Sequence, residues 1–317
     1  MSGQRIVIIG GSFAGLSAVK ALACSSVDIL LLNRENYYTF SPLLHEVATG
    51  ELAPELIAHS IRTMLKHMHN VQFMTADVKL VDVNNHVIQT DKDLISYDFL
   101  IIATGSNAHL ISTPGASNYT FPVKKLQEAV NLRNQIISCL EKAVLEVNPS
   151  RQKQLLTFAI ISGRTTGVEL AASLREMIMA LVPDYPTLDF SLSRVILLQA
   201  GDRFIPQFYQ RSHVSRITSE ALYLNDSTTI QSSTIIWAGG AVENVPMKTC
   251  GLSSIKNGQV PVLPTLQIAE HPQVYFVGYL ASLPVMPMLG AVAIQQGKMA
   301  AMNLMRQIKG LKLLPMC

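Results

Sequence analysis

The feature that most constrains the fold is an apolar strand that runs straight into a glycine turn, a helix and a second apolar strand. Ile6–Ile9 is followed by the turn Gly10–Gly15, a predicted helix over Leu16–Ala23 and a predicted strand over Val27–Leu32. Both strands are almost continuously hydrophobic, which is typical of strands buried on both faces of a parallel sheet. The segment is therefore predicted to form a β-turn-α-β unit.

The same order of elements returns about 150 residues later. The sequence predicts a strand over Leu155–Ile161, a turn over Ser162–Gly167, a helix over Val168–Leu181 and a strand over Val195–Leu198. Because such a unit binds one half of a dinucleotide site, its repetition predicts an α/β protein with two Rossmann-like domains. Further predicted elements are a helix over Ala53–His69, strands over Val71–Met74, Val78–Val83, His86–Thr90, Tyr97–Ala103, Ile235–Ala238 and Tyr275–Val277, and long helices over Leu126–Val147 and Gly290–Ile308.

Composition excludes several classes of protein. The chain has 317 residues, of which 49% are hydrophobic and 15% charged, so it can bury two cores and is neither disordered nor a small disulfide scaffold. A net charge of +3 gives no argument for nucleic acid. The four cysteines (Cys24, Cys139, Cys250 and Cys317) lie far apart and are interpreted as reduced thiols of an intracellular protein. His67 and His69 lack neighbouring ligands, so no metal site is expected.

Two segments bear on membranes and targeting. No signal peptide is expected, because Met1–Arg5 runs directly into the first strand. Phe276–Ile294 carries no charge and is long enough to span a bilayer, but Pro284 and Pro287 interrupt it. We expect a buried strand, a loop and a helix start there.

The first glycine turn has the chemistry of a diphosphate site. A helix N-terminus offers unpaired N–H groups and a partial positive charge to an anion, and glycines let the backbone approach it. The usual pattern is GxGxxG, whereas this turn has Gly10, Ser12 and Gly15 at the three positions. The acidic residue that usually binds ribose at the end of the second strand is replaced by Asn33. The alternative is a tight turn that binds no phosphate.

The second turn departs further from the pattern. Its three glycine positions hold Ser162, Arg164 and Gly167, and Gln199 stands where an acidic residue is expected. A large side chain in the middle obstructs the approach of a diphosphate, although an arginine can also bind phosphate as a cation. Nucleotide binding and a purely structural turn both remain open here. The missing acid also leaves NADPH open beside NADH.

Residues 40–50, Phe-Ser-Pro-Leu-Leu-His-Glu-Val-Ala-Thr-Gly, resemble the FxPLLxxVATG segment of type II NADH:quinone oxidoreductases, which belong to the two-dinucleotide-domain flavoproteins. Weaker matches follow in the same order along nearly the whole chain, at residues 103–105, 166–170, 236–240 and 293–297. The resemblance implies FAD-binding segments at 1–112 and 242–317, with a shortened NAD(P)-binding-like domain inserted at 113–241. It implies electron transfer from NADH or NADPH through FAD to a quinone, with no nucleophile required.

The resemblance also implies site residues. FAD is expected on Gly10, Ser12, Phe13, Ala14, Gly15, Asn33, Arg34, Leu43, Val78, Thr104, Gly105 and Gly278. NAD(P)H is expected on Gly163, Gly167, Glu169, Gln199, Ala238 and Gly239. Ser41, Pro42 and Gln295 are expected at the flavin and the quinone. Thiol–disulfide chemistry is not expected, because no close cysteine pair is present.

Departures from the family pattern support a second hypothesis. Besides Arg164, the stretch from Arg203 to Ile235 is short, Tyr279 replaces an aspartate after Gly278, and the first glutamine of the family's AQxAxQ helix start is missing. The alternative is thus a non-catalytic flavin- or nucleotide-binding descendant that acts as a partner-binding module.

The location and assembly of the protein are less constrained by the sequence. Six of the 13 methionines fall between Met286 and Met316, where Lys298, Arg306, Lys309 and Lys312 also lie. The methionines either pack in the core or form an adaptable apolar surface for quinone or lipid. The basic residues belong either to an ordinary amphipathic surface helix or to one that rests on an anionic bilayer. We expect a cytoplasmic protein, which lies on the inner face of a membrane if the segment binds lipid. A homodimer is left open.

Overall fold

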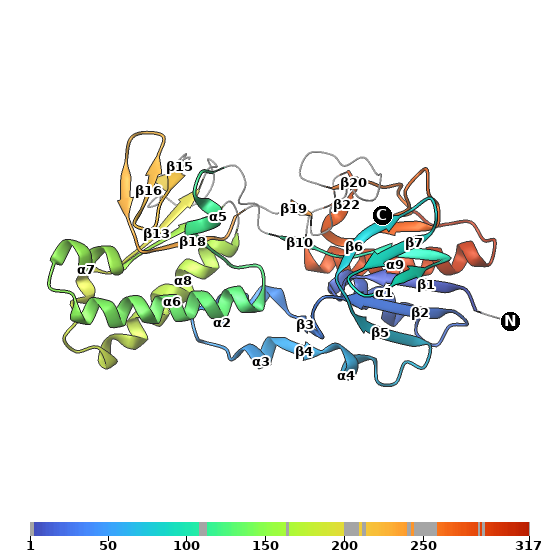
Figure 1. Ribbon diagram of the computed structural model, residues 1–317, viewed down its shortest axis with the longest axis horizontal. Coiled ribbons are helices and arrows are strands. Elements are labelled where there is room, and N and C mark those ends of the chain that lie inside the picture. The colour runs from blue at the N-terminus through green and yellow to red at the C-terminus, as the bar shows by residue number, and fades with distance from the viewer. Residues whose placement is uncertain are drawn as a thin grey trace. The chain divides into compact units, whose positions relative to one another are not determined.

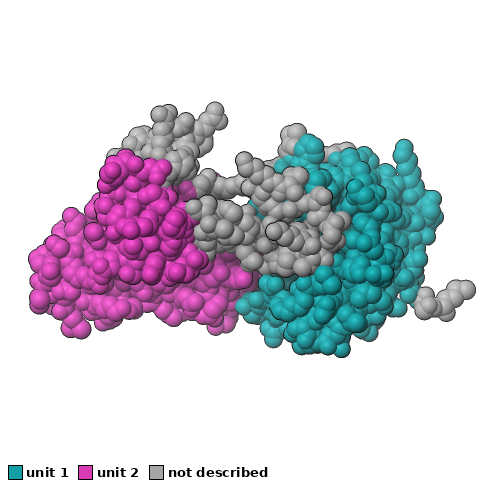
Figure 2. Space-filling view, turned by 45° about the horizontal axis from the view of Figure 1, so that its top comes forward, with its two compact units in different colours: residues 1–38, 59–107, 242–317 teal, residues 39–58, 108–241 magenta. Residues whose placement is uncertain are grey.

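The computed structural model describes residues 3–107, 113–162, 165–199, 209–210, 214–239, 242–243, 259–284, 286 and 289–316. The chain forms two compact units (Figures 1 and 2). The first unit comprises Met1–Tyr38, His59–Asn107 and Val242–Cys317, and the second comprises Thr39–Ala58 and Ala108–Ala241. The chain therefore belongs to the α/β class with parallel sheets typical of two Rossmann-like domains, as the sequence predicts. Residues 39–58, which carry the PLLxxVATG run, lie in the second unit.

A five-stranded sheet forms the centre of the first unit. Its strand order is β21-β9-β1-β2-β5, and all neighbours are parallel. The strands are β21 (Val274–Phe276), β9 (Phe99–Ile102), β1 (Arg5–Ile9), β2 (Asp28–Asn33) and β5 (Val71–Thr75). Because they are parallel, their carboxyl ends meet at one edge, where the glycine turn after β1 lies.

Both faces of this sheet are covered, which explains why its strands are apolar on both sides. Alternate residues such as Ile6 and Ile8 pack against α1 (Phe13–Leu22) and α9 (Gly290–Ile308). Val7 and Ile9 face a three-stranded antiparallel sheet instead. That sheet consists of β6 (Val78–Asp82), β7 (Val87–Thr90) and β8 (Leu94–Ser96).

The second unit repeats the arrangement around another five-stranded parallel sheet, of order β11-β18-β12-β13-β14. The strands are β11 (Phe121–Pro122), β18 (Thr234–Trp237), β12 (Thr157–Ile161), β13 (Arg194–Gln199) and β14 (Tyr209–Gln210). On one face lie α6 (Leu126–Leu145), α8 (Thr165–Leu181) and the short α2 (Leu44–Ala48). On the other lies the antiparallel sheet of β15 (Val214–Ile217), β16 (Ala221–Leu224) and β17 (Thr229–Gln231).

The connection from β13 to β14 contains nine residues, 200 to 208. A parallel crossover usually needs a dozen or more residues and a helix. This length agrees with the sequence observation that the stretch after residue 203 is short.

Three sequence-based element predictions differ from the structure. The helix predicted over Ala53–His69 is wrong: the segment forms α3 (Pro54–Ile57), β4 (Ala58–Ser60) and α4 (Ile61–Leu65). The cause is tertiary, because β4 pairs with β3 (Tyr37–Thr39). The helix α7 (Pro149–Leu155) was missed, although Asn148 before Pro149 is a typical N-cap signal. The meander β15–β17 was also missed.

The uncharged stretch Phe276–Ile294 contains separate short elements. It includes the end of β21, the 3₁₀ turn η5 (Gly278–Leu280), β22 (Ala281–Ser282) and the first residues of α9. In the part of the chain that the structure describes, we find no helix with the length and apolar content of a membrane span.

Candidate functional site

The first glycine turn connects β1 to α1 at the carboxyl edge of the first sheet. Gly10 has a φ of +107°, which favours glycine, and a Cβ at this position would overlap the carbonyl of Ala103. A Cβ on Gly15 would overlap the carbonyl oxygen of Gly10. Both positions therefore require glycine for the backbone to pass, as the pattern predicts.

Ser12, at the middle position, stabilises the turn. It is the N-cap of α1, and its Oγ accepts a hydrogen bond from the Gly15 N–H at 3.4 Å. The same hydroxyl donates to the carbonyl of Ala103 at 2.7 Å. The hydroxyl thus joins the helix start to the end of β9, so its proton is already used within the protein.

Asn33, at the end of β2, holds the same turn from the other side. Its Oδ1 accepts a hydrogen bond from the Gly11 N–H at 2.8 Å, and its Nδ2 donates to the carbonyl of Glu35 at 2.8 Å. One amide hydrogen remains after these two bonds. The carboxamide that stands in place of the usual ribose-binding acid therefore supports the turn.

A charged group follows at the ends of β2 and β5. The Arg34 Nε donates to Asp77 Oδ1 at 2.5 Å, and the Lys79 Nζ lies 2.7 Å from Asp77 Oδ2. The hydrogen bond from Lys79, and after it the one from Arg34, lowers the pKa of Asp77. Val78 next to it is buried in the core, so any contact it makes with a ligand comes from its backbone.

The side chain of Phe13 is occupied by packing. Its ring meets that of Tyr38 edge-on, with centroids 5.5 Å apart, and a Cβ at Gly290 would lie 3.5 Å from it. Burial raises the pKa of Tyr38 to about 12, so this phenol stays neutral. Phe13 and Ala14 therefore present main-chain rather than side-chain groups at the start of α1.

Two more positive-φ glycines lie at the same edge. Gly105 follows β9 with a φ of +67°, and Gly278 follows β21 with a φ of +75°. A Cβ at Gly278 would lie 3.5 Å from the Cβ of Ala14. The structure thus brings the three strand ends together around the start of α1, although their residues are far apart in the sequence. Thr104 is half-buried beside Gly105.

Sequence reasoning missed Gln296 at this edge. Gln296 lies on α9, is only 3% exposed, and accepts a hydrogen bond from the Gly278 N–H at 2.6 Å. Its neighbour Gln295, the expected quinone-side residue, is exposed. A polar residue within the apolar stripe of a helix is the signal that could have revealed Gln296.

In the second unit, the PLLxxVATG run has an exposed start and a buried end. Ser41 and Pro42 are exposed and Leu43 is partly buried in the 3₁₀ turn η1 (Ser41–Leu43). Leu44 and Val47 of the following α2 are buried against α6 and α8. Leu44, Val47 and Ala48 of the motif are therefore core, and Ser41 and Pro42 are accessible.

The second glycine turn retains the close packing of the first. A Cβ at Gly167 would overlap the side chain of Ser162, just as Gly15 meets Gly10. The Ala238 N–H donates to the carbonyl of Ile161 at 2.9 Å, and Gly239 follows. Glu169 is exposed on α8. Gly163, Arg164 and the side chain of Gln199 lie outside the described residues.

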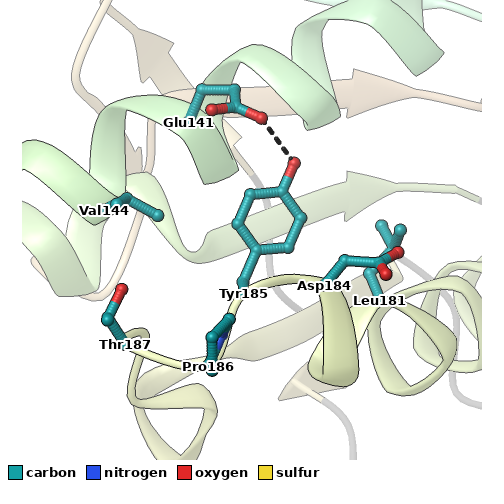
Figure 3. A pocket seen from close by; sticks show the side chains of 7 residues that line it. All are labelled: Glu141, Val144, Leu181, Asp184, Tyr185, Pro186 and Thr187. Carbon is teal, nitrogen blue, oxygen red and sulfur yellow. Dashed lines mark hydrogen bonds between the residues drawn. The ribbon is translucent and has the colours of Figure 1, made fainter.

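The second unit also has a pocket of about 370 Å³ away from these residues (Figure 3). It is lined by Glu141, Val144, Leu181, Asp184, Tyr185, Pro186 and Thr187. The Tyr185 hydroxyl donates to Glu141 at 2.8 Å, and burial followed by this bond raises the pKa of Tyr185 to about 12. The hydroxyl is held as a neutral hydrogen-bond donor, and we assign the pocket no chemistry.

The first turn fits a diphosphate. The positive φ of Gly10, the absence of side chains at Gly10 and Gly11, and the start of a ten-residue helix supply backbone access and partial positive charge. For the second turn, the described residues establish only the helix and strand packing.

The family of the chain follows from its similarity to known proteins. Residues 4–297 match the family of pyridine nucleotide-disulphide oxidoreductases. The chain belongs to this family, whose members are NAD(P)H-dependent flavin oxidoreductases that generally bind FAD and NAD(P)H.

Individual relatives narrow the resemblance. The chain is 29% identical to the type II NADH:quinone oxidoreductase Ndh of Mycobacterium tuberculosis, over 97% of this chain and 73% of that protein. It is 26% identical to an external alternative NAD(P)H-ubiquinone oxidoreductase of Arabidopsis thaliana, over 91% of this chain but 57% of that one. Among solved structures it is similar to NDH2 from Plasmodium falciparum in complex with NADH, with a TM-score of 0.79, 21% identity, and coverage of 88% of this chain and 64% of that one.

Proposed function

We propose that this protein is an FAD-dependent oxidoreductase that passes electrons from NADH or NADPH to a quinone. The observation that carries the proposal is the first glycine turn, which combines a positive-φ Gly10, a capped helix start and an Asn33 support in a member of a flavin oxidoreductase family. The similarity to type II NADH:quinone oxidoreductases supports the choice of quinone.

In this proposal, most FAD contacts come from the main chain of the first unit. Ser12, Phe13 and Ala14 bind the diphosphate through N–H groups and the helix terminus. Gly10 and Gly15, whose N–H groups are bonded within the protein, let the backbone approach it. Asn33 and Arg34 are proposed to contact the adenosine, and the Val78 backbone the adenine. The residues proposed towards the flavin are Leu43, Thr104, Gly105 and Gly278.

The remaining site residues serve the two substrates. The second unit supplies Gly163, Gly167, Glu169, Gln199, Ala238 and Gly239 to the nicotinamide nucleotide. Ser41 and Pro42 are proposed beside the flavin and Gln295 on the quinone side, and all three are exposed.

FAD, when bound, supplies the redox chemistry by accepting a hydride and passing on two electrons. The overall reaction is balanced as NAD(P)H, one proton and a quinone giving NAD(P)⁺ and a quinol. The protein residues bind and orient the partners, and none has to form a covalent bond.

The test is spectroscopic. The purified protein should show a flavin band at about 450 nm, lose it on addition of NADH, and regain it with a short-chain quinone. A colourless protein that takes up no added FAD would contradict the proposal. Bleaching by NADH without reoxidation by quinone would indicate a flavoenzyme with a different electron acceptor.

A second candidate function is a non-catalytic, partner-binding descendant of the family. It is favoured by the nine-residue connection between β13 and β14, by Tyr279 in place of an acid, and by Arg164 in the second turn. It predicts a protein that binds flavin or nucleotide but whose flavin NADH does not bleach.

We also propose that the protein works at a membrane surface. No Asp or Glu follows Glu270, whereas Lys298, Arg306, Lys309 and Lys312 do. Apolar side chains are exposed nearby, with Leu289 at 59% and Leu311 at 50%. Such a surface suits an anionic bilayer, where a quinone dissolves. Sedimentation with vesicles that contain anionic lipid, but not with neutral ones, is the expected result, and equal sedimentation with both would contradict it.

A further inference from the structure

We infer that Gln296 is a positioning residue for FAD, an inference that rests on the proposed function. Gln296 lies on α9, and its relative exposure is only 3%. Its Oε1 accepts the Gly278 N–H at 2.6 Å, so a side chain from the closing helix holds the loop that follows β21. This loop reaches the first turn of α1, where the diphosphate is proposed to bind.

The loop that follows β21 lies beside both α1 and α9. A Cβ at the adjacent Gly297 would overlap the carbonyl of Ala14, so α9 crosses α1 at its first turn. A Cβ at Gly278 would lie 3.5 Å from the Cβ of Ala14 and 3.9 Å from that of Ala293. The hydrogen bond from Gly278 to Gln296 therefore fixes the loop against both helices. A displacement of this loop would change the shape of the cradle at Ala14.

The identity of the acceptor matters because the loop has no acidic side chain of its own. Tyr279 follows Gly278, and no Asp or Glu occurs after Glu270. A carboxamide supplies the acceptor without adding a negative charge beside an anionic cofactor. Gln296 thus supports, from α9, the loop in which Tyr279 replaces the aspartate of the family pattern.

The helix α9 offers a matched control. Asn303 lies seven positions further along and is fully buried. It donates to the carbonyls of Thr265 at 3.1 Å and Leu314 at 2.8 Å, and accepts from the Leu314 N–H at 2.9 Å. Substitution of Asn303 removes buried hydrogen bonds of a carboxamide on the same helix without affecting the contact to Gly278.

The experiment measures the dissociation constant of FAD, the thermal unfolding of the apoprotein and the visible circular dichroism of the bound flavin. Gln296→Met removes the acceptor at similar volume, and Gln296→Asn shortens the side chain by one methylene so that it misses Gly278. We expect each variant to weaken FAD binding about tenfold and to change the dichroism. Gln296→Glu at about pH 6, where burial keeps much of such a carboxyl neutral, should remain within about threefold of wild type.

The outcomes separate the alternatives. Asn303→Leu should lower the unfolding temperature but leave FAD affinity within about twofold. Wild-type affinity in both Gln296→Met and Gln296→Asn would overturn the inference, as would equal weakening by Asn303→Leu, because the effect would then be one of stability. A wild-type protein that binds no FAD would overturn the proposed function itself and the inference with it.

Discussion

The two glycine turns share the same backbone connections but differ at the positions that would serve a ligand. In the first unit the Gly10 N–H donates to Leu32 at 2.8 Å, and in the second the Ser162 N–H donates to Leu198 at 3.0 Å. In both, the last glycine packs against the first position of the turn. The first two positions are Gly10 and Ser12 in one turn and Ser162 and Arg164 in the other.

This difference indicates which requirements belong to the fold and which to the ligand. The last glycine is needed wherever a helix must pack closely on the strand before it, so it persists in both units. The middle position must be small where a diphosphate approaches, whereas Gly10 at the first position is also required by its positive φ and by the carbonyl of Ala103. The arginine at the middle position of the second turn therefore bears on nucleotide binding.

The strongest test of the comparison replaces the last glycine in each turn. Gly15→Ala should cost about 3 kcal/mol and abolish FAD binding, because the new Cβ meets the backbone of Gly10. Gly167→Ala should cost about as much, because the new Cβ meets the Ser162 Cβ, which moves only with its own backbone, but it should leave FAD binding within about twofold. Urea unfolding and FAD titration of both variants provide the measurements, and a much smaller loss of stability in Gly167→Ala would mean that the last glycine is not a requirement of the fold in the second turn.

The second test addresses the middle position of the second turn. Arg164→Gly should tighten NADH binding about tenfold, because it clears the approach that a diphosphate needs. Fluorescence titration with NADH measures the affinity, and Arg175→Ala on the exposed face of α8 is the control. An unchanged affinity in Arg164→Gly would favour the non-catalytic alternative.

The third test concerns the middle position of the first turn. Ser12→Ala removes the N-cap of α1 and the bond to Ala103, and should destabilise the protein by about 1 kcal/mol. FAD affinity should fall by less than about threefold, because the hydroxyl proton is bonded within the protein. Ser60→Ala, which removes the N-cap of α4, is the control for capping alone. A loss of FAD binding far larger than the loss of stability would indicate that the hydroxyl contacts the ligand directly.

The smallest expected effect lies at the adenosine end of the first unit. Asp77→Asn should cost less than about 1 kcal/mol, since Arg34 and Lys79 are largely exposed. The pKa of Asp77 is lowered in the folded state, so its contribution is present above its unfolded pKa and is lost as the pH falls through its folded pKa. The difference between variant and wild type in urea unfolding should therefore be present at about pH 7 and shrink progressively as the pH falls below about 4, the ordinary pKa of an aspartate. A difference that persists in acid would exclude the ion pairs as its cause.

The sequence predicts the parts of the fold that depend on local pattern. The apolar strands β1 and β12, the helix α9 with its bounds, and the requirement for Gly10 and Gly15 follow from periodicity and turn chemistry. The break of the helix predicted over Ala53–His69 does not, because it results from pairing of β4 with β3.

The candidate site also has one part that the local sequence predicts and another that depends on distant residues. The placement of a diphosphate site at Gly10–Gly15 needs only the local order of strand, turn and helix. The roles of Ser12 and Asn33 as internal supports, and of Gln296 towards Gly278, need partners that are 18 to 91 positions away in the sequence. No local pattern encodes such pairs.

The carboxamide of Asn303 acts towards Leu314 as a neighbouring strand would, donating to its carbonyl and accepting from its N–H. Together with the bond from the Met316 N–H to Pro264, this fastens residues 314–316 to the body of the first unit. Lys309, Leu311 and Lys312 lie between α9 and this fastened stretch. In the proposed membrane contact, they would meet a bilayer on a segment that is held at both ends. The orientation of this segment at a bilayer would then follow from the orientation of the first unit as a whole, because the segment is not a flexible linker.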